Sequence, residues 1–284
     1  MQRNEQLIMH LRKIRDNNYN LAEDENVQSY ADLMLQHIGD TDPELRDDLI
    51  FSTFCEWICE KEYFNEEELR QMLTVLLDDH HVFYHIGSFE DSTVFTRTFS
   101  ILVVVLILCQ HRKKAFLDFD VFTKVKDKLI LYYQQEKDFR GYLDDCGWAH
   151  GAAHGADAMD ELVQCKESDE SVCTEVLGAI QNVLWNGKYL FSNEEDERMA
   201  RVVYRIIKNN LMPSQLINNW ISRLCQCCEW DKTRTQYIAR VNSKNFVRCL
   251  YFKLEHKKCA SDISHMLFEV EKKLNRFFEI DKDI

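Results

Sequence analysis

Residues that interrupt helices are scarce in this chain. Among its 284 residues there are only two prolines, Pro43 and Pro213, and eight glycines. Proline and glycine mark the turns of loop-rich and strand-rich proteins, so their scarcity predicts long helices with short connections. We therefore predict an all-α fold.

Basic surface and long apolar runs are also lacking. The formal net charge is −13, which repels phosphate backbones and anionic lipid surfaces. The short basic stretches HRKK (111–114) and HKK (256–258) are typical of helix ends. The most apolar run, ILVVVLILC (101–109), is shorter than the about 20 residues that span a bilayer, and it predicts the middle of a buried helix. We expect neither a nucleic-acid nor a membrane partner.

The chain does not open on an apolar segment, and common nucleotide-binding and nucleophile motifs are missing. The first residues, MQRNEQLIMHLRKIRDNN, are polar, so the eleven cysteines are expected to be free thiols of a reduced cytoplasmic protein. The patterns G-x-x-x-x-G-K-[ST], G-x-G-x-x-G and G-x-S-x-G do not occur. Any chemistry must therefore come from another arrangement of residues.

Helix starts are marked along the whole chain. Asp42 precedes Pro43, Asn65 precedes three glutamates, and the stretches beginning at Ser192 and Met212 open in the same way. The segments between them are similar in length and follow one another with little linker. We predict antiparallel helix pairs stacked as a HEAT-like α-solenoid or α/α superhelix, with a compact bundle as the alternative. Residues 1–284 are expected to form a single domain, with a weak subdivision near 134–147.

Two arginines are expected to be structural ion-pair partners. The predicted helix from Ser92 to Cys109 has no charge after Arg97, so this guanidinium needs a carboxylate or several carbonyl groups inside the protein. An anion-binding role is the alternative for Arg97. Arg198, in the acidic stretch EEDER, is free to form an ion pair inside the stack.

The stretch GWAHGAAHGAD (147–157) has the strongest claim to chemistry. A helix over residues 148–163 would place His150, His154, Asp157 and Glu161 in one stripe, because their spacings are i, i+4, i+7 and i+11. Taken alone, this pattern fits an amphipathic helix with its polar face in water.

The small residues in this stretch argue against a solvated helix. Gly151 and Gly155 each cost about 1 kcal/mol relative to alanine inside a helix. Close approach by neighbouring helices explains why they and the surrounding alanines are there. The histidines would then face a partly buried pocket, where their polar groups require partners.

Three interpretations of the stripe stay open. It is a structural His–Asp network, a ligand or anion pocket, or a metal site formed by His150, His154 and Asp157. The zinc-peptidase motif H-E-x-x-H lacks its glutamate, because Gly151 occupies that position. The cofactor is thus unknown, and a divalent metal is not the favoured interpretation.

Five stretches together resemble a known family. They are DPELRDDL (42–49), EDSTVFTRTFSIL (90–102), DFRGYLDDCGWAHGAAHGAD (138–157), EEDERMA (194–200) and NSKNFVRCLYFKL (242–254). Together they are similar to the bacterial domain-of-unknown-function family 2785 (DUF2785), over about residues 40–255. The resemblance implies a bacterial or phage source and one helical domain, and it assigns no activity.

Two functions of different class follow. The first is a cytoplasmic interaction or ligand-binding module that recognises a protein segment or small ligand. Its candidate binding residues are Arg140, Trp148, His150, His154, Asp157 and Glu161. The alternative is a metal-dependent hydrolase in which the His150, His154 and Asp157 stripe holds a metal-bound water. The sequence leaves open whether the protein is an enzyme.

Overall fold

Helices make up most of the computed structural model, which describes residues 2–278. The α-helices are α1 (Gln2–Asp16), α2 (Val27–Gln36), α3 (Ser52–Cys55), α4 (Glu66–Leu76), α5 (Thr93–Lys113), α6 (Phe119–Gln135), α7 (Gly151–Leu162), α8 (Glu170–Leu184), α9 (Glu195–Lys208), α10 (Ser214–Arg223), α11 (Arg234–Lys257) and α12 (Ser261–Leu274). Two π-helical segments, η1 (Glu44–Phe51) and η2 (Glu56–Glu60), flank α3, and the 3-10 segment η3 (Leu224–Glu229) follows α10. Across the described residues, the strands are limited to an antiparallel hairpin of β1 (Tyr142–Leu143) and β2 (Gly147–Trp148). The predicted all-α fold is confirmed.

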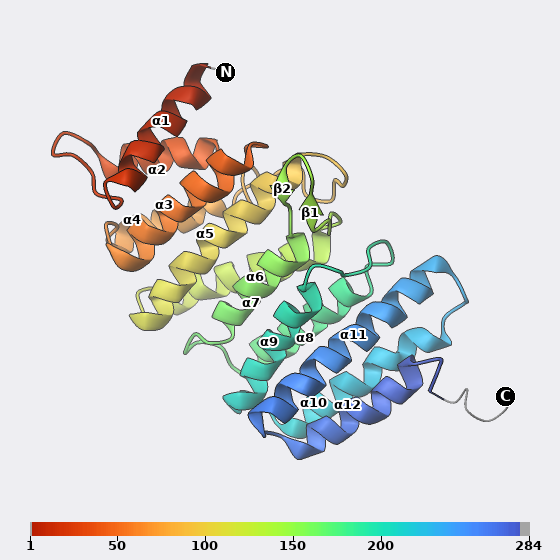
Figure 1. Ribbon diagram of the computed structural model, residues 1–284. Helices are drawn as coiled ribbons and strands as arrows, with labels where there is room; N and C mark the ends of the chain where they lie inside the picture. Colours follow the sequence, from red (N-terminus) through yellow and green to blue (C-terminus); the bar gives the residue numbers. More distant parts are fainter. Residues whose placement is uncertain (1, 279–284) are drawn as a thin grey trace.

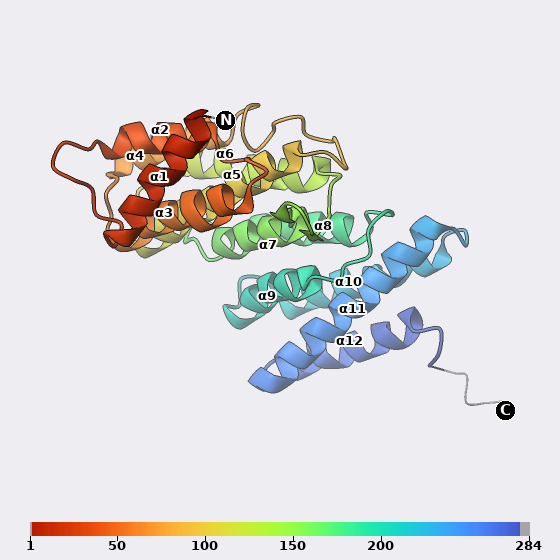
Figure 2. The same cartoon turned by 45° about the horizontal axis from the view of Figure 1, so that its top comes forward.

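The helices follow one another in chain order from one end of the molecule to the other. Helix α5 packs against α7, α7 against α9, and α9 against α11, while α6 packs against α8 and α10 against α12. Figure 1 shows α5, α7, α9 and α11 crossing the molecule in succession. Figure 2 shows the same succession as layers that end at α12. The finer HEAT-like regularity stays a prediction.

Local sequence signals explain several helix starts. Asn65 accepts hydrogen bonds from the backbone at the start of α4, and Glu68 accepts the Asn65 N–H, so the predicted start is a full capping box. Asp42 also caps, since its Oδ1 accepts the Glu44 N–H at 3.0 Å. The segment that follows Asp42 is the π-helical η1, where an α-helix was expected.

Helix α5 contains the apolar run 101–109 and is buried. It begins at Thr93 and has 21 residues, so it extends beyond the predicted end at Cys109. By length and composition α5 could cross a membrane, but 78% of its apolar window is buried inside the protein. Its Arg97 is fully buried beside Glu136, to which Nε and Nη2 donate at 2.7 and 3.0 Å. This pairing supplies the carboxylate that a buried guanidinium requires.

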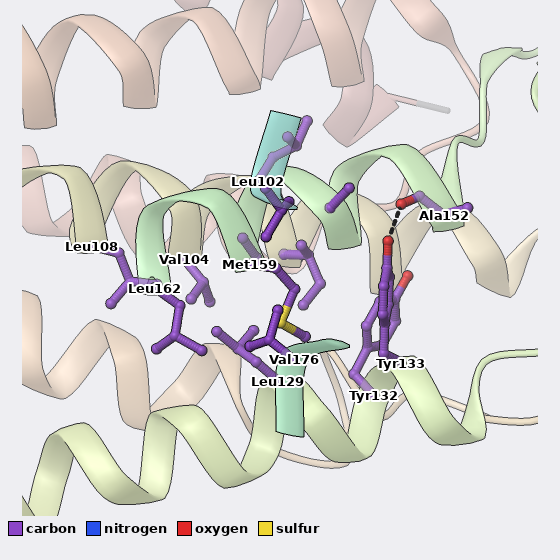
Figure 3. Close-up of a cluster of buried hydrophobic side chains, with 14 of the residues drawn as sticks. Leu102, Val104, Leu108, Leu129, Tyr132, Tyr133, Ala152, Met159, Leu162 and Val176 are labelled. Atoms are coloured by element: carbon purple, nitrogen blue, oxygen red, sulfur yellow. Dashed lines mark hydrogen bonds between the residues drawn. The ribbon is translucent and has the colours of Figure 1, made fainter. Parts of the chain in front are cut away.

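Helix α7 approaches α6 closely because its facing residues are small. A Cβ at Gly155 would collide with the Tyr133 ring, and one at Gly151 would lie 2.6 Å from the Asp138 carbonyl oxygen. The Tyr133 hydroxyl donates to the Ala152 carbonyl at 2.5 Å, as Figure 3 shows. The close approach inferred from the glycines is therefore present, and α7 lies inside the stack.

The two helical glycines Gly155 and Gly178 provide a matched test of this packing. Gly155→Ala should lower the free energy of unfolding by ~1–3 kcal/mol, because the new methyl group overlaps the Tyr133 ring. Gly178 of α8 has open space around it, so Gly178→Ala should raise stability by about 1 kcal/mol. Urea denaturation of both variants measures the two effects. Equal stabilisation by both substitutions would show that α7 does not touch α6.

Candidate functional site

The backbone around His150 differs from the predicted helix. Residues 148–150 were expected to open the helix, but Trp148 lies in β2 and α7 begins at Gly151. His150 adopts a left-handed conformation with φ 54°, and its carbonyl accepts the His154 N–H at 2.9 Å. The predicted stripe is therefore wrong at its first position: His150 precedes the helix that carries His154, Asp157 and Glu161.

The two histidines nevertheless lie together, inside a row of aromatic rings. Their ring centroids are 5.4 Å apart, and each residue is only 5% exposed. Trp148 stacks on His150 with centroids 4.2 Å apart and the planes 2° from parallel. On the other side, Phe99 of α5 meets His154 edge to face at 5.5 Å. Both imidazoles are thus fixed in orientation by their neighbours.

The histidines line a cleft of about 610 Å³ that several distant segments build. Its walls come from η1, α5, the hairpin with the start of α7, and the segment that leads into α9. The lining residues are Asp47, Phe51, Phe99, Leu102, Trp148, His150, His154, Ser192, Asn193, Glu194 and Arg198. The volume lies within the range of small-molecule pockets, ~300–1,000 Å³.

Burial keeps both imidazoles neutral. It lowers the pKa of His150 to about 4, with a further contribution from the positive charge of Arg198. Burial also lowers the pKa of His154 well below its usual range, and His150 and Arg198 add to the effect. Within residues 2–278, Nδ1 of each ring is buried without a hydrogen-bond partner. A neutral imidazole has one donor and one acceptor nitrogen, and the His154 ring also has a hydrogen bond with the backbone of Thr98.

A carboxyl group from a distant segment, Asp47 of η1, lines the same cleft as the histidines. Burial raises the pKa of Asp47 to about 6, although its neighbour Arg46 acts in the opposite direction. Arg46 is fully buried, and its Nε lies 2.7 Å from Asp47 Oδ1. The Arg46 guanidinium also stacks over the Phe99 ring at 4.6 Å. Asp47 is therefore held in place, with its side chain 24% exposed.

The segment before α9 forms the remaining wall. A helix was expected to open at Ser192, but α9 begins at Glu195, because Glu194 is left-handed with φ 62°. This turn places Ser192 and Glu194 along the cleft, together with Arg198 from the first turns of α9. Left-handed residues other than glycine are uncommon, and two of them, His150 and Glu194, border this cleft.

Three predicted binding residues are engaged elsewhere. Asp157 accepts from Arg198 and Arg201 of α9, and Glu161 pairs with Arg112 of α5 at 2.7 Å. Arg140 pairs with Asp138 at 2.6 Å and also donates to the Asp91 carbonyl. None of the three lines the cleft, so the predicted site keeps only Trp148, His150 and His154. Arg198, expected to be an ion-pair partner, both pairs with Asp157 and lines the cleft.

The proposed metal ligands do not form one group. Each carboxylate oxygen of Asp157 accepts from a guanidinium, Oδ2 from Arg198 and Oδ1 from Arg201. Over the described part of the chain, groups of three or more His, Cys, Asp or Glu that could hold a metal ion are absent. His150 and His154 thus lie together without the third ligand that the stripe suggested.

Sequence reasoning missed the residues that are contributed from a distance. Asp47 and Phe51 lie about 100 residues before the histidines, and Glu194 lies about 40 residues after them. One signal was available for Glu194: four acidic residues in a row, EEDE at 194–197, exceed what one helix start needs. The sequence offers no comparable signal for Asp47.

Comparisons with known proteins identify one similarity. The model of the family described as "Protein of unknown function (DUF2785)" matches residues 82–252. The matched range includes both histidines, Glu194 and Arg198, whereas Asp47 and Phe51 lie outside it. No curated protein and no solved structure shows a significant match.

The depressed pKa of His150 predicts a specific loss of stability in acid. The pKa is 6.5 for a free side chain and about 4 in the folded protein. The unfolded chain therefore binds the proton first, and stability falls as the pH drops from 6.5 toward 4. Between pH 7 and pH 5, the titration of His150 should lower the free energy of unfolding by about 2 kcal/mol.

The variant His150→Asn isolates this contribution, because asparagine tolerates the left-handed backbone and does not titrate. Asp47, whose pKa is raised, makes the folded state relatively more stable as the pH falls. This contribution is present in both the wild-type protein and the variant, so it cancels in the comparison. Urea denaturation at pH 7 and pH 5 should give a smaller acid-induced loss for the variant. An identical loss in both proteins would mean that His150 is solvated.

Proposed function

The chain belongs to the DUF2785 family, and from its cleft we propose that it is a cytoplasmic bacterial binding module. The cleft takes a small ligand, or a single protruding side chain of a protein segment, between η1 and α9. It combines apolar and aromatic walls with a few polar groups, which is the usual composition of a ligand pocket. The perturbed pKa values of His150, His154 and Asp47 add to this support.

The two buried, neutral imidazoles in the wall of the cleft carry the proposal. In the part of the chain that the structure describes, Nδ1 of His150 and of His154 are both buried without a hydrogen bond. Leaving a buried polar atom unpaired costs ~1–3 kcal/mol. The two Nδ1 atoms lie beneath the surface of the cleft, in neighbouring rings that line it, so a ligand that draws either ring toward it would relieve this cost.

The backbone at the cleft gives independent support. His150 and Glu194 hold left-handed conformations that glycine would adopt without steric cost. They are two of the ten non-glycine residues with positive φ in the described chain, and the only two of these that line the cleft. The presence of an imidazole and a carboxylate instead is consistent with side chains that serve the cleft.

The metal-dependent hydrolase is the less supported alternative. It needs a third ligand beside the two imidazoles, and the predicted one, Asp157, is held by two arginines. Neutral imidazoles can still bind a metal ion, so the two histidines remain competent ligands, but the site lacks a third one. Elemental analysis of the protein purified without added metal tests this alternative directly. A stoichiometric transition metal that is lost in His154→Ala would favour the hydrolase.

A screen of small compounds tests the binding function. The probe is a library of small neutral, cationic and anionic compounds, and the readout is the NMR signals of the histidine ring protons. We expect hits that shift the signals of both His150 and His154, assigned with His150→Asn and His154→Gln. The binding proposal fails if no compound in the library shifts either histidine.

The two exposed tryptophans Trp148 and Trp230 supply a matched control. They are 39% and 38% exposed, but only Trp148 lines the cleft. Trp148→Ala should weaken the binding of the hits by ~10-fold, since aromatic contacts of this kind contribute about 1 kcal/mol or more. Trp230→Ala should leave the affinities unchanged. Equal effects of the two substitutions would place the binding site elsewhere.

Replacing a left-handed residue separates stability from binding. Glu194→Gly should raise the free energy of unfolding by a few tenths to about 1 kcal/mol, because glycine removes the steric cost of a positive φ. It should also weaken cationic hits, because the cleft loses a carboxylate. Lys258→Gly, at φ 50° after α11 and outside the cleft lining, should stabilise similarly without affecting binding. Thermal denaturation and titration of the hits measure both effects.

A further inference from the structure

The cleft presents charged groups of both signs that do not neutralise each other. Arg198 and Glu194 are four residues apart, but Arg198 Nη1 pairs with Asp157 of α7 instead. In the described residues, the Glu194 side chain has no ion-pair partner and is exposed to the cleft. Asp47 of η1 adds a second carboxyl group to the lining of the same cleft.

Arg198 keeps donors available for a carboxylate. Over residues 2–278, Asp157 occupies only its Nη1, while Nε and Nη2 lack protein partners. The side chain is 36% exposed where it borders the cleft. A guanidinium binds a carboxylate through two parallel N–H bonds, so the two remaining nitrogens match that group better than a single cation would.

Glu194 and Asp47 provide acceptors for an ammonium group. Within the described chain, the Glu194 carboxylate forms no ion pair, and Asp47 forms its ion pair with Arg46. The neutral imidazoles of His150 and His154 border the same cleft and add no positive charge that would repel an ammonium group. These acceptors lie on the same cleft as the free edge of Arg198.

The apolar residues between these groups fit a hydrocarbon or aromatic body. Phe51 and Phe99 meet edge to face, with centroids 6.4 Å apart, and Leu102 lies beside them in the lining. Trp148 also lines the cleft and stacks on His150. Such walls favour the burial of an apolar side chain, at ~25 cal/mol per Å² of surface removed from water.

We propose that the cleft binds an amino-acid-like zwitterion, with its carboxylate on Arg198, its ammonium on Glu194 and Asp47, and its apolar side chain against Phe51, Phe99 and Trp148. This inference rests on the proposed binding function and specifies its ligand class. The shared chemistry is an ammonium and a carboxylate on one small apolar body. A free amino acid and a short peptide that carries both termini can each supply it.

Three probes with the same aromatic body test the charge requirement. They are phenylalanine, which carries both charges, phenethylamine, which carries only the ammonium, and 3-phenylpropionate, which carries only the carboxylate. Titrations of the 284-residue chain are followed by calorimetry and by the histidine ring signals. We expect phenylalanine to bind at least ~10-fold more tightly than either singly charged probe, because each lost charged hydrogen bond reduces affinity by about that factor. Phenylalanyl-glycine in a parallel titration distinguishes a peptide from a free amino acid.

Two charge-removing variants assign each end of the zwitterion. Glu194→Gln should weaken phenylalanine and phenethylamine by ~10-fold and leave 3-phenylpropionate unchanged. Arg198→Gln should weaken phenylalanine and 3-phenylpropionate and leave phenethylamine unchanged. Glu23→Gln and Arg223→Gln are the controls, because both residues are exposed and lie outside the cleft lining.

Measuring the stability of Arg198→Gln distinguishes a loss of binding from a loss of folding. Arg201 also pairs with Asp157, at 2.6 Å, so Arg198→Gln leaves that carboxylate a partner. If Arg198→Gln is unstable, Arg198→Lys retains the charge without the two-pronged geometry and should still weaken the carboxylate probes. The zwitterion is overturned if a singly charged probe binds as tightly as phenylalanine, or if no probe binds. In that case, hits from the broader library that shift the histidine signals would still support the binding function, with a ligand of another class.

Discussion

The close approach of α6 to α7 is the constraint on which the rest of the structure depends. Tyr133 lies against the bare backbone of Gly155, and its hydroxyl bonds to the Ala152 carbonyl. Since α7 has only hydrogen atoms at Gly151 and Gly155, its first turns sit close to α6, and the helix touches α5, α6 and α9 together. Farther along α7, Met159 points toward Leu129 of α6 and Val176 of α8, while His154 meets Phe99 of α5.

The segment that joins these two helices is tied down by charge. Glu136 pairs with the buried Arg97 and also accepts the Asp138 N–H at 2.8 Å. Asp138 in turn pairs with Arg140 and accepts a backbone N–H from Glu90. Breaking a buried pair of this kind leaves an uncompensated charge, which costs several kcal/mol. Residues 136–140, within the stretch 134–147 where a weak subdivision is predicted, are therefore anchored to α5 and to the loop before it.

Sequence reasoning succeeded where the signal was local. The Asn65 capping box, the burial of 101–109 and the meaning of Gly151 and Gly155 each follow from residues within a few positions of one another. It failed at His150, because only the structure shows that a left-handed residue precedes α7. Helical periodicity then assigned Asp157 to the histidines, whereas the neighbouring arginines of α9 hold it. Periodicity describes one helix, and it contains no information on what the adjacent helix presents.

The non-local origin of the cleft links distant parts of the chain. Asp47 and Arg198 are about 150 residues apart, so the cleft is complete only when the first layers and α9 are both in place. A molecule bound there would contact both the first layers and α9, and it would stabilise the state in which the two remain packed together. The free energy of this stabilisation depends on the ligand concentration relative to its dissociation constant. Ligand occupancy at the middle of the stack would thus appear as slower amide hydrogen exchange in η1. The N-terminal layers, which lie mostly outside the family match, would become the part of the molecule whose mobility reports whether the cleft is filled.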